Sequence, residues 1–144
     1  MKKQIASVLP NASLEEVLLA FRRKISDVLR KEADNLQCPM SHIDALVYIA
    51  EKGEPSMKDI AAHLKITPPS TTAIIEAMQK KELIKRVMSD TDRRTIRVAL
   101  TPEAWKLFKT FHEHKFAIFT KMLSKLKDAD KTELIRILTI LITE

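Results

Sequence analysis

Glycine is nearly absent from this chain of 144 residues, which has one glycine, one cysteine and only 5% aromatic residues. A dinucleotide-binding fingerprint and a Walker-type phosphate loop each need several glycines where the backbone approaches phosphate, so both are excluded. One glycine and six prolines are also too few turn formers for a β-sandwich or a β-barrel. The composition therefore predicts a mainly helical protein.

Long apolar segments are missing as well. Residues 1–13 contain no apolar stretch of signal-peptide length, and charged residues interrupt every apolar run before the roughly twenty residues that a membrane span needs. The single cysteine, Cys38, cannot form a disulfide within the chain. We therefore expect a cytoplasmic protein that contacts no membrane.

The chain is instead rich in apolar and basic residues. Apolar residues make up 45% of it, enough for one packed core, and 25 Lys and Arg against 19 Asp and Glu give a net charge of +6. This balance suits a polyanionic partner such as nucleic acid, although many basic proteins bind none. No Ser, His and Asp share a recognisable catalytic turn, and no carboxylate pair lies among apolar neighbours, so we expect neither an enzyme nor a cofactor.

Apolar residues at helical spacing predict two helices in the first third of the chain. The first begins at Leu14, with Ser13 as its N-cap and Glu16 placed to complete a capping box. Cys38–Pro39 interrupts this pattern. A second, shorter helix ends near Gly53, where we expect a positive φ.

A short helix, a tight turn and a further helix follow. Residues 57–66 form the short helix, and Thr67 caps a helix that starts at Pro68 and runs to about Leu83. Helical spacing buries one side of that helix and leaves the other more exposed. The buried residues are Thr71, Ile74, Ile75 and Met78, and the exposed ones are Pro69, Ser70, Thr72, Ala73, Glu76 and Ala77.

A change to alternating apolar residues predicts a β-hairpin. Its strands are residues 86–88 and 95–100, and residues 89–94 form an entirely polar tip. Thr101 then caps another helix, with Pro102 at its first position. The apolar face of the second strand consists of Ile96, Val98 and Leu100.

Residues 102–144 supply two further helices that carry more than one apolar stripe. Helices that are apolar on several faces need partners on several sides, and a chain of this length offers few. We therefore expect a homodimer formed through both ends of the chain.

The order helix, turn, helix, hairpin is that of a winged helix-turn-helix, whose second helix enters a DNA major groove. Asp92-Arg93-Arg94, followed after a strand by Leu100-Thr101, resembles the wing motif of the multiple antibiotic resistance regulator (MarR) family of transcription factors. Residues 57–64 and 66–78 are similar to that family's first motif helix and recognition helix. The resemblance implies an all-α fold with a small two- to three-stranded β wing. In it, a winged helix-turn-helix over about residues 40–101 is flanked by dimerisation helices over about residues 13–37 and 102–144.

The recognition helix suits a major groove because its outer side chains are small. Ser70 and Thr72 are expected to bond base edges or phosphates, and Pro69 and Ala73 to touch thymine methyl groups. Thr67, at the amide end of the helix, is expected to favour a phosphate.

The wing adds positive charge. By the resemblance, Asp92 holds the wing with an ion pair and Arg94 places its guanidinium in the minor groove, where narrow A·T-rich stretches concentrate negative potential. The alternative is a solvated tip of mutually paired charges. Further basic residues either neutralise the DNA backbone or are ordinary surface residues: Arg86, Arg93 and Arg97, with Lys80, Lys81 and Lys85.

Two features depart from the family pattern. Family members often carry Arg or Lys near Ala73 and Ala77, whereas Glu76 stands here, so specificity is expected to lean on DNA shape rather than guanine contacts. The family's usual glycines near Glu82 and Ala104 are also absent, which leaves the geometry of two turns open.

The resemblance implies a repressor that binds a pseudo-palindromic DNA operator. It also implies release of the DNA when a small anionic or aromatic ligand binds between the dimerisation and DNA-binding parts. Two recognition helices must then match one DNA turn, about 34 Å. Candidates to face the ligand are His42, Tyr48 and Phe21.

Three alternatives stay open at this point. Cys38 is either an oxidant sensor at a helix start or a buried apolar filler. A metal-responsive variant is disfavoured, because His112 and His114 point about 200° apart on a helix and cannot bind one ion together. A winged-helix dimer is also able to bind protein rather than DNA.

Overall fold

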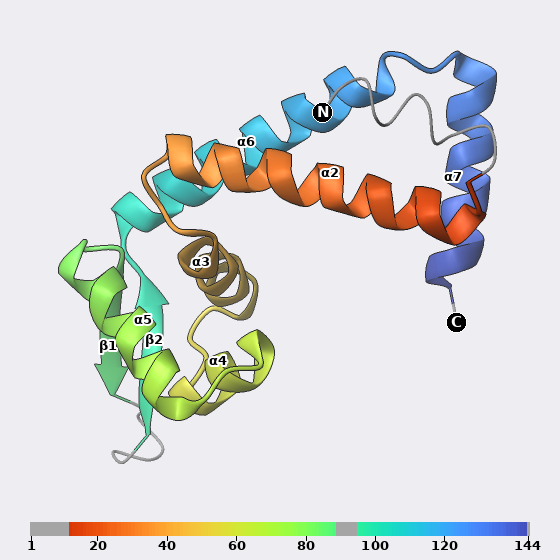
Figure 1. The fold of residues 1–144 in the computed structure, drawn as a ribbon. Helices are drawn as coiled ribbons and strands as arrows, with labels where there is room; N and C mark the ends of the chain where they lie inside the picture. The colour runs from red at the N-terminus through yellow and green to blue at the C-terminus, as the bar shows by residue number, and fades with distance from the viewer. Residues whose placement is uncertain (1–11, 89–94, 144) are drawn as a thin grey trace.

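The protein is described here by a computed structural model covering residues 12–88 and 95–143 (Figure 1). These residues form helices and one two-stranded antiparallel sheet, which confirms the predicted helical fold with a small wing. The helices are α2 (Leu14–Asn35), α3 (Met40–Lys52), α4 (Met57–Leu64), α5 (Pro68–Lys80), α6 (Pro102–Leu123) and α7 (Asp128–Ile142). The strands are β1 (Ile84–Met88) and β2 (Ile96–Leu100).

Side-chain caps start four of the helices. Ser13, Thr67 and Thr101 cap α2, α5 and α6, as their positions in the sequence predict. Ser56 forms a reciprocal capping box with Asp59 at the start of α4. Because the first N–H groups of a helix have no partner within it, each such cap is worth roughly 1 kcal/mol.

The main hydrophobic core joins α3, α4, α5 and the hairpin. Its largest fully buried apolar side chains are Leu46, Ile49, Ile60, Ile75, Met78 and Val98. Burial of each is worth roughly 1.5–3 kcal/mol relative to exposure. A smaller cluster attaches α2 and α6 to α3 and consists of Ala33, Cys38, Ile43 and Phe111.

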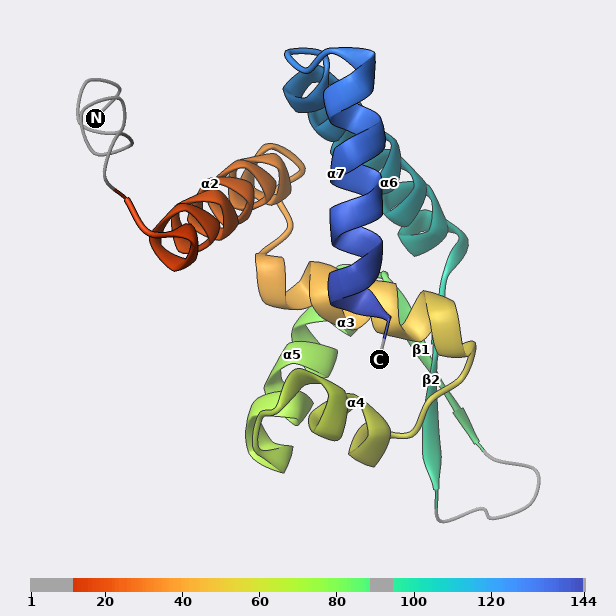
Figure 2. The ribbon, with the colours of Figure 1, turned by 90° about the vertical axis from the view of Figure 1, so that its right-hand side faces the viewer.

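The helices outside the main core form the other end of the molecule. In Figure 1, α2 and α6 extend away from the hairpin towards α7, and Figure 2 shows α4, α5 and the hairpin at the opposite end from the α6–α7 connection. Within residues 12–88 and 95–143, no helix has the length and apolar character needed to cross a membrane.

Several predicted boundaries need correction. Helix α4 ends at Leu64 rather than residue 66, and α5 ends at Lys80 rather than near Leu83. Strand β1 starts at Ile84, two residues earlier than predicted, because Ile84 is buried in the core. The predicted positive φ at Gly53 is confirmed, at 82°.

The predicted alternation along β2 is wrong in part. Val98 and Leu100 are buried, but Ile96 is 41% exposed and Ala99, on the other face, is buried. Ile96 pairs with Met88 at the outer end of the hairpin, and Met88 is exposed as well. Burial in β2 therefore follows distance from the core more than strand alternation.

Candidate nucleic-acid interface

Helix α5 presents the outer face that its spacing predicted. Thr71, Ile75 and Met78 are buried against the core, whereas Pro69 and Ala73 lie on the exposed side. Thr71 is a buried polar residue, and its hydroxyl donates to the carbonyl of Thr67 at 3.0 Å. The helix is thus fixed to the domain by one side, and the side with small residues faces outwards.

The hydroxyl groups at the start of α5 bond to their own helix. Thr67 Oγ1 accepts from the N–H of Ser70 at 3.4 Å and lies 3.0 Å from Ser70 Oγ. Thr72 Oγ1 donates to the carbonyl of Pro68 at 3.1 Å. A hydroxyl oxygen has two lone pairs, so a hydroxyl that donates within the helix still has acceptor capacity for an incoming donor.

A hollow of about 330 Å³ lies between α4, α5 and the hairpin. Arg86 on β1 and Thr72 on α5 both line it, so the structure brings these two predicted DNA contacts together. Arg86 is exposed, and it shares a sheet face with buried Val98, its partner in the strand register. The guanidinium therefore lies on the side of the hairpin that faces the helices.

Arg97 has a structural role, in linking the hairpin to the loop before α4, that the sequence does not predict. Its guanidinium donates to the carbonyl of Glu54 at 2.9 Å, and the next N–H, of Val98, donates to the carbonyl of Pro55 at 3.0 Å. Hydrogen bonds from Ser56 lower the pKa of Asp59, and the charge of Arg97 adds to this effect. Arg97 thus fixes the loop before α4 to the hairpin, and its contact with DNA stays a prediction.

The three wing residues expected to serve DNA binding lie outside the described residues: Asp92, Arg93 and Arg94. Their positions as the tip between β1 and β2 follow from the chain order alone. Their assignment to DNA therefore stays a prediction from the sequence.

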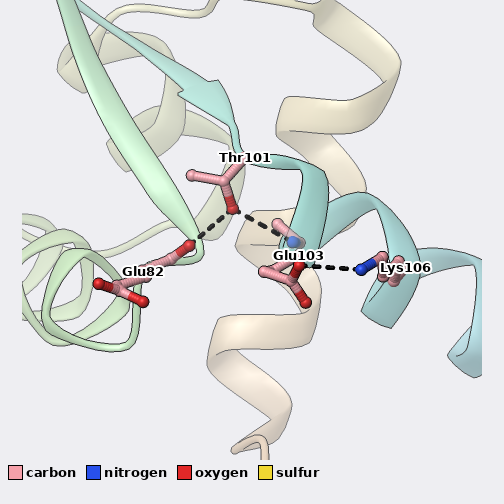
Figure 3. A network of polar contacts seen from close by, with 5 residues as sticks. Glu82, Thr101, Glu103 and Lys106 are labelled. Atoms are coloured by element: carbon pink, nitrogen blue, oxygen red, sulfur yellow. Dashed lines mark hydrogen bonds and ion pairs between the residues drawn. The ribbon is translucent and has the colours of Figure 1, made fainter.

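The turn between α5 and β1 forms without the glycine that the family pattern has there. Glu82 adopts a left-handed conformation with φ of 57°. The hydroxyl of Thr101 donates to the Glu82 carbonyl at 2.6 Å and accepts from the N–H of Ala104 at 3.2 Å (Figure 3). Glu103 and Lys106 form an ion pair at 2.9 Å beside it. One threonine therefore joins the end of the recognition helix to the start of α6.

A second contact holds the same end of α5. Lys81, the residue after the helix, donates from Nζ to the carbonyl of Gln37 at 3.1 Å. Gln37 lies between α2 and α3 and has a φ of 53°. The C-terminal end of α5 is therefore connected both to the α2–α3 turn and to α6.

A hollow of about 340 Å³ lies among α2, α3, α4 and α6. Its polar lining groups are Asp44, His63 and Lys115, and burial raises the pKa of Asp44, although His63 acts against this. Its apolar lining residues are Leu29, Met40, Ile43, Val47, Leu64 and Phe111. The hollow is thus an apolar cleft with two basic side chains and one carboxyl group.

The structure does not bring the three residues expected to face a ligand together in this hollow. His42 is buried, and its Nδ1 has no hydrogen-bond partner among the described residues. Burial lowers the pKa of His42, and Lys81 acts in the same direction. Tyr48 stacks on His63 with ring centroids 4.0 Å apart, and Phe21 lines a separate groove against α6 and α7. The groups available to a ligand here are His63 and Lys115 instead.

Comparison with known proteins agrees with this architecture. Residues 39–96 match the family model described as MarR family. This segment therefore belongs to the MarR family. YpoP of Bacillus subtilis, an uncharacterized HTH-type transcriptional regulator, is 29% identical over 86% of this chain and 84% of its own. MdtR of the same organism, an HTH-type transcriptional repressor, is 24% identical over 78% of this chain and 73% of its own.

Solved MarR-family structures share the fold at low sequence identity. MepR, a transcription regulator of a Staphylococcus aureus multidrug efflux pump, has a TM-score of 0.83 at 16% identity, over 91% of this chain and 97% of MepR. A MepR variant bound to an oligodeoxyribonucleotide has a TM-score of 0.73 at 18% identity, over 92% and 97%. The relatives are transcriptional regulators rather than enzymes, and together with the family match and the shared fold they support a MarR-family regulator with a DNA-binding winged-helix fold.

Cys38 in this MarR-family chain is a buried apolar residue. It is 3% exposed and packs in the cluster with Ile43, five residues further on, as the residue before a helix cap commonly does. Burial raises the pKa of its thiol, although Lys81 acts against this, which favours the buried apolar filler over the oxidant sensor. A thiol in this state is a poor nucleophile.

The histidines of α6 lie apart, as helix geometry predicts. His114 contacts Glu32 of α2 at 2.5 Å, whereas the His112 ring lies between the rings of Phe108 and Phe116. Among residues 12–88 and 95–143, no group of three or more His, Cys, Asp or Glu side chains is arranged to hold a metal ion.

Proposed function

We propose that this MarR-family regulator is a homodimeric repressor that binds a pseudo-palindromic DNA operator through α5 and the wing and leaves it when a small ligand binds. The observation that carries this proposal is the apolar surface left exposed on the helices outside the winged domain. A second copy of the chain would bury that surface, and a two-fold symmetric dimer matches a two-fold symmetric DNA site.

The exposed apolar surface lies on both ends of the chain. Monomeric proteins rarely expose contiguous apolar patches larger than a few hundred Å², so an exposed surface with this many large apolar residues needs a partner. A groove between α2, α6 and α7 is lined almost wholly by apolar atoms. The exposed residues are Leu14, Val17, Leu18, Leu19 and Phe21 on α2, Trp105, Phe116 and Leu123 on α6, and Ile135, Ile137, Leu138, Ile140, Leu141 and Ile142 on α7.

The DNA contacts proposed for each protomer combine α5 with the wing. Thr67, Pro69, Ser70, Thr72 and Ala73 lie on or beside the exposed face of α5, where short side chains allow close approach to a major groove. Support for duplex DNA as the partner comes from the MepR variant solved with an oligodeoxyribonucleotide. The basic residues proposed to meet the DNA backbone and minor groove are Arg86, Arg93, Arg94 and Arg97, with Asp92 holding the tip.

The proposed effector is a small molecule with an anionic group and an apolar or aromatic body. It would occupy the hollow among α2, α3, α4 and α6, where Lys115 attracts an anion and Phe111 and Leu29 pack against an apolar body. Because the hollow lies between the exposed helices and the winged domain, an occupant changes the angle between them. A change of a few ångströms in the spacing of two α5 helices is enough to lose the fit to one DNA turn.

The test uses duplexes enriched by the protein from a pool of genomic fragments, with affinity measured by fluorescence polarisation. Arg94→Ala is expected to weaken binding to an A·T-flanked site at least tenfold, about 1.4 kcal/mol, with an unchanged circular-dichroism melting curve. Equal affinity for variant and parent would reject the role of the wing. The logarithm of affinity should also fall steeply with the logarithm of salt concentration. A flat dependence would favour the alternative in which the module binds protein.

A further inference from the structure

The exposed face of α5 carries an acidic residue among small and basic side chains. Residues 69, 73, 76 and 80 follow one another along this face and are all exposed, opposite the buried Thr71, Ile75 and Met78. The only charged residues within the helix are Glu76 and Lys80. The face therefore presents two small side chains first, then a carboxylate, then an amine.

The Glu76 carboxylate is free to accept hydrogen bonds. Among residues 12–88 and 95–143, no hydrogen bond or ion pair engages it, even though Lys80 stands one turn further along the same face. The next lysine, Lys81, is directed instead to the carbonyl of Gln37. Both oxygens of Glu76 are therefore open to a donor from outside the chain.

A carboxylate in a DNA groove is tolerated only where a base donates to it. An ionised carboxylate accepts hydrogen bonds but donates none, and the DNA phosphates repel its negative charge. In the major groove, guanine and thymine present acceptors, and the adenine amino group lies beside the N7 acceptor. Cytosine presents its N4 amino group without an acceptor on the same base edge.

We propose that Glu76 is a specificity-determining residue that selects a cytosine in each half of the operator by accepting from its N4 amino group. This inference rests on the proposed function, because it requires α5 to enter a major groove. It also gives the carboxylate a second effect: at sites without that cytosine, Glu76 lowers affinity through repulsion by the phosphates. Direct base contact by α5 thus supplements any recognition of DNA shape.

The experiment is selection of binding sites from a duplex pool of randomised sequence by four proteins: the parent, Glu76→Gln, Glu76→Ala and Glu113→Gln. The last is the control, because it removes one exposed carboxylate from α6, where Glu113 pairs with Lys109. The parent and Glu113→Gln should enrich the same motif with one C·G pair at symmetric positions. Glu76→Ala should leave those positions degenerate, and Glu76→Gln should move them to A·T, because a carboxamide pairs with adenine N6 and N7.

Affinities for single duplexes give the magnitude. Replacing the selected cytosine should cost the parent about tenfold and Glu76→Ala less than about twofold. Glu76→Ala should also bind randomised DNA more tightly than the parent at equal salt. Because the Glu76 side chain is exposed, the melting temperature of Glu76→Ala should match that of the parent. An identical motif from the parent and Glu76→Ala would overturn this inference alone, whereas no enriched motif from the parent would overturn the proposed function with it.

Discussion

The hydroxyl of Thr101 donates to the carbonyl oxygen of Glu82 at 2.6 Å across 19 residues of chain. The same hydroxyl accepts from the N–H of Ala104, so it both caps α6 and secures the left-handed turn after α5. A left-handed conformation at a residue other than glycine costs roughly 1–2 kcal/mol, and this hydrogen bond offsets part of that cost. The hydroxyl of Thr101 thus helps to fix the recognition helix relative to α6, together with the hydrogen bond from the Thr101 N–H to the Leu83 carbonyl at 3.1 Å.

Replacing that hydroxyl should destabilise the winged domain. Thr101→Ala is expected to lower the free energy of unfolding by about 1–3 kcal/mol, from the lost cap and the lost bond to Glu82. Thr101→Ser keeps the hydroxyl and should lose much less. Urea unfolding followed by circular dichroism measures both, and equal losses for the two variants would show that the hydroxyl has no such role.

The capping box at α4 should make stability sensitive to acid. Hydrogen bonds from Ser56, and then the charge of Arg97, hold the pKa of Asp59 below the ordinary value of about 4. The unfolded chain therefore takes up this proton first as pH falls, so the stabilisation is complete above about pH 4 and is lost as pH falls through the folded-state pKa.

The variant that tests this is Asp59→Asn, which keeps an oxygen acceptor for Ser56 but cannot ionise. It should be less stable than the parent at pH 7, and the difference should shrink towards pH 3. Thermal melts across this range provide the measurement. A difference that stays constant with pH would mean that ionisation of Asp59 contributes nothing.

Placing a charge on the exposed apolar surface should separate the proposed dimer. Leu141 is 67% exposed on α7, and Leu141→Glu would put a carboxylate into an apolar interface. We expect this variant to be monomeric in sedimentation velocity and to lose at least tenfold in affinity for operator DNA. Lys125→Glu, in the connection between α6 and α7, is the control and should stay dimeric. A dimeric Leu141→Glu would place the interface elsewhere.

The proposed effector site predicts a variant that binds DNA but does not respond. With benzoate as a probe of anionic aromatic ligands, Lys115→Gln should need several-fold more of it to release DNA than the parent does, because the cationic partner of the carboxylate is lost. Its affinity for DNA without benzoate should equal that of the parent. Fluorescence polarisation reports both quantities, and the same release curve for the two proteins would exclude Lys115 from the site.

Features that depend on neighbouring residues could be predicted from the sequence. Helix starts are predicted by Ser13, Thr67 and Thr101, because a side-chain cap acts over only three residues. The buried face of α5 is predicted by the spacing of Thr71, Ile75 and Met78. The outward placement of its small residues follows from the same period of 3.6.

Features that depend on residues distant in the chain could not be predicted from the sequence. The sequence predicts Arg97 as a surface cation. Its partner, the carbonyl of Glu54, lies 43 residues away and comes within hydrogen-bond distance only when the hairpin packs beside the loop before α4. The same holds for the hollow among α2, α3, α4 and α6: His42 is buried, and His63 and Lys115 line one hollow only through the packing of the helices. Likewise, nothing local in the sequence shows that Glu82 takes the left-handed conformation reserved for glycine in the family pattern.

The central claim is that two chains together present two α5 helices to one duplex. The most direct measurement is light scattering of the protein after size-exclusion chromatography, alone and with an enriched duplex. We expect twice the 16.5 kDa mass of one chain for the free protein, and two chains on each duplex in the complex. A mass of one chain in both samples would contradict it.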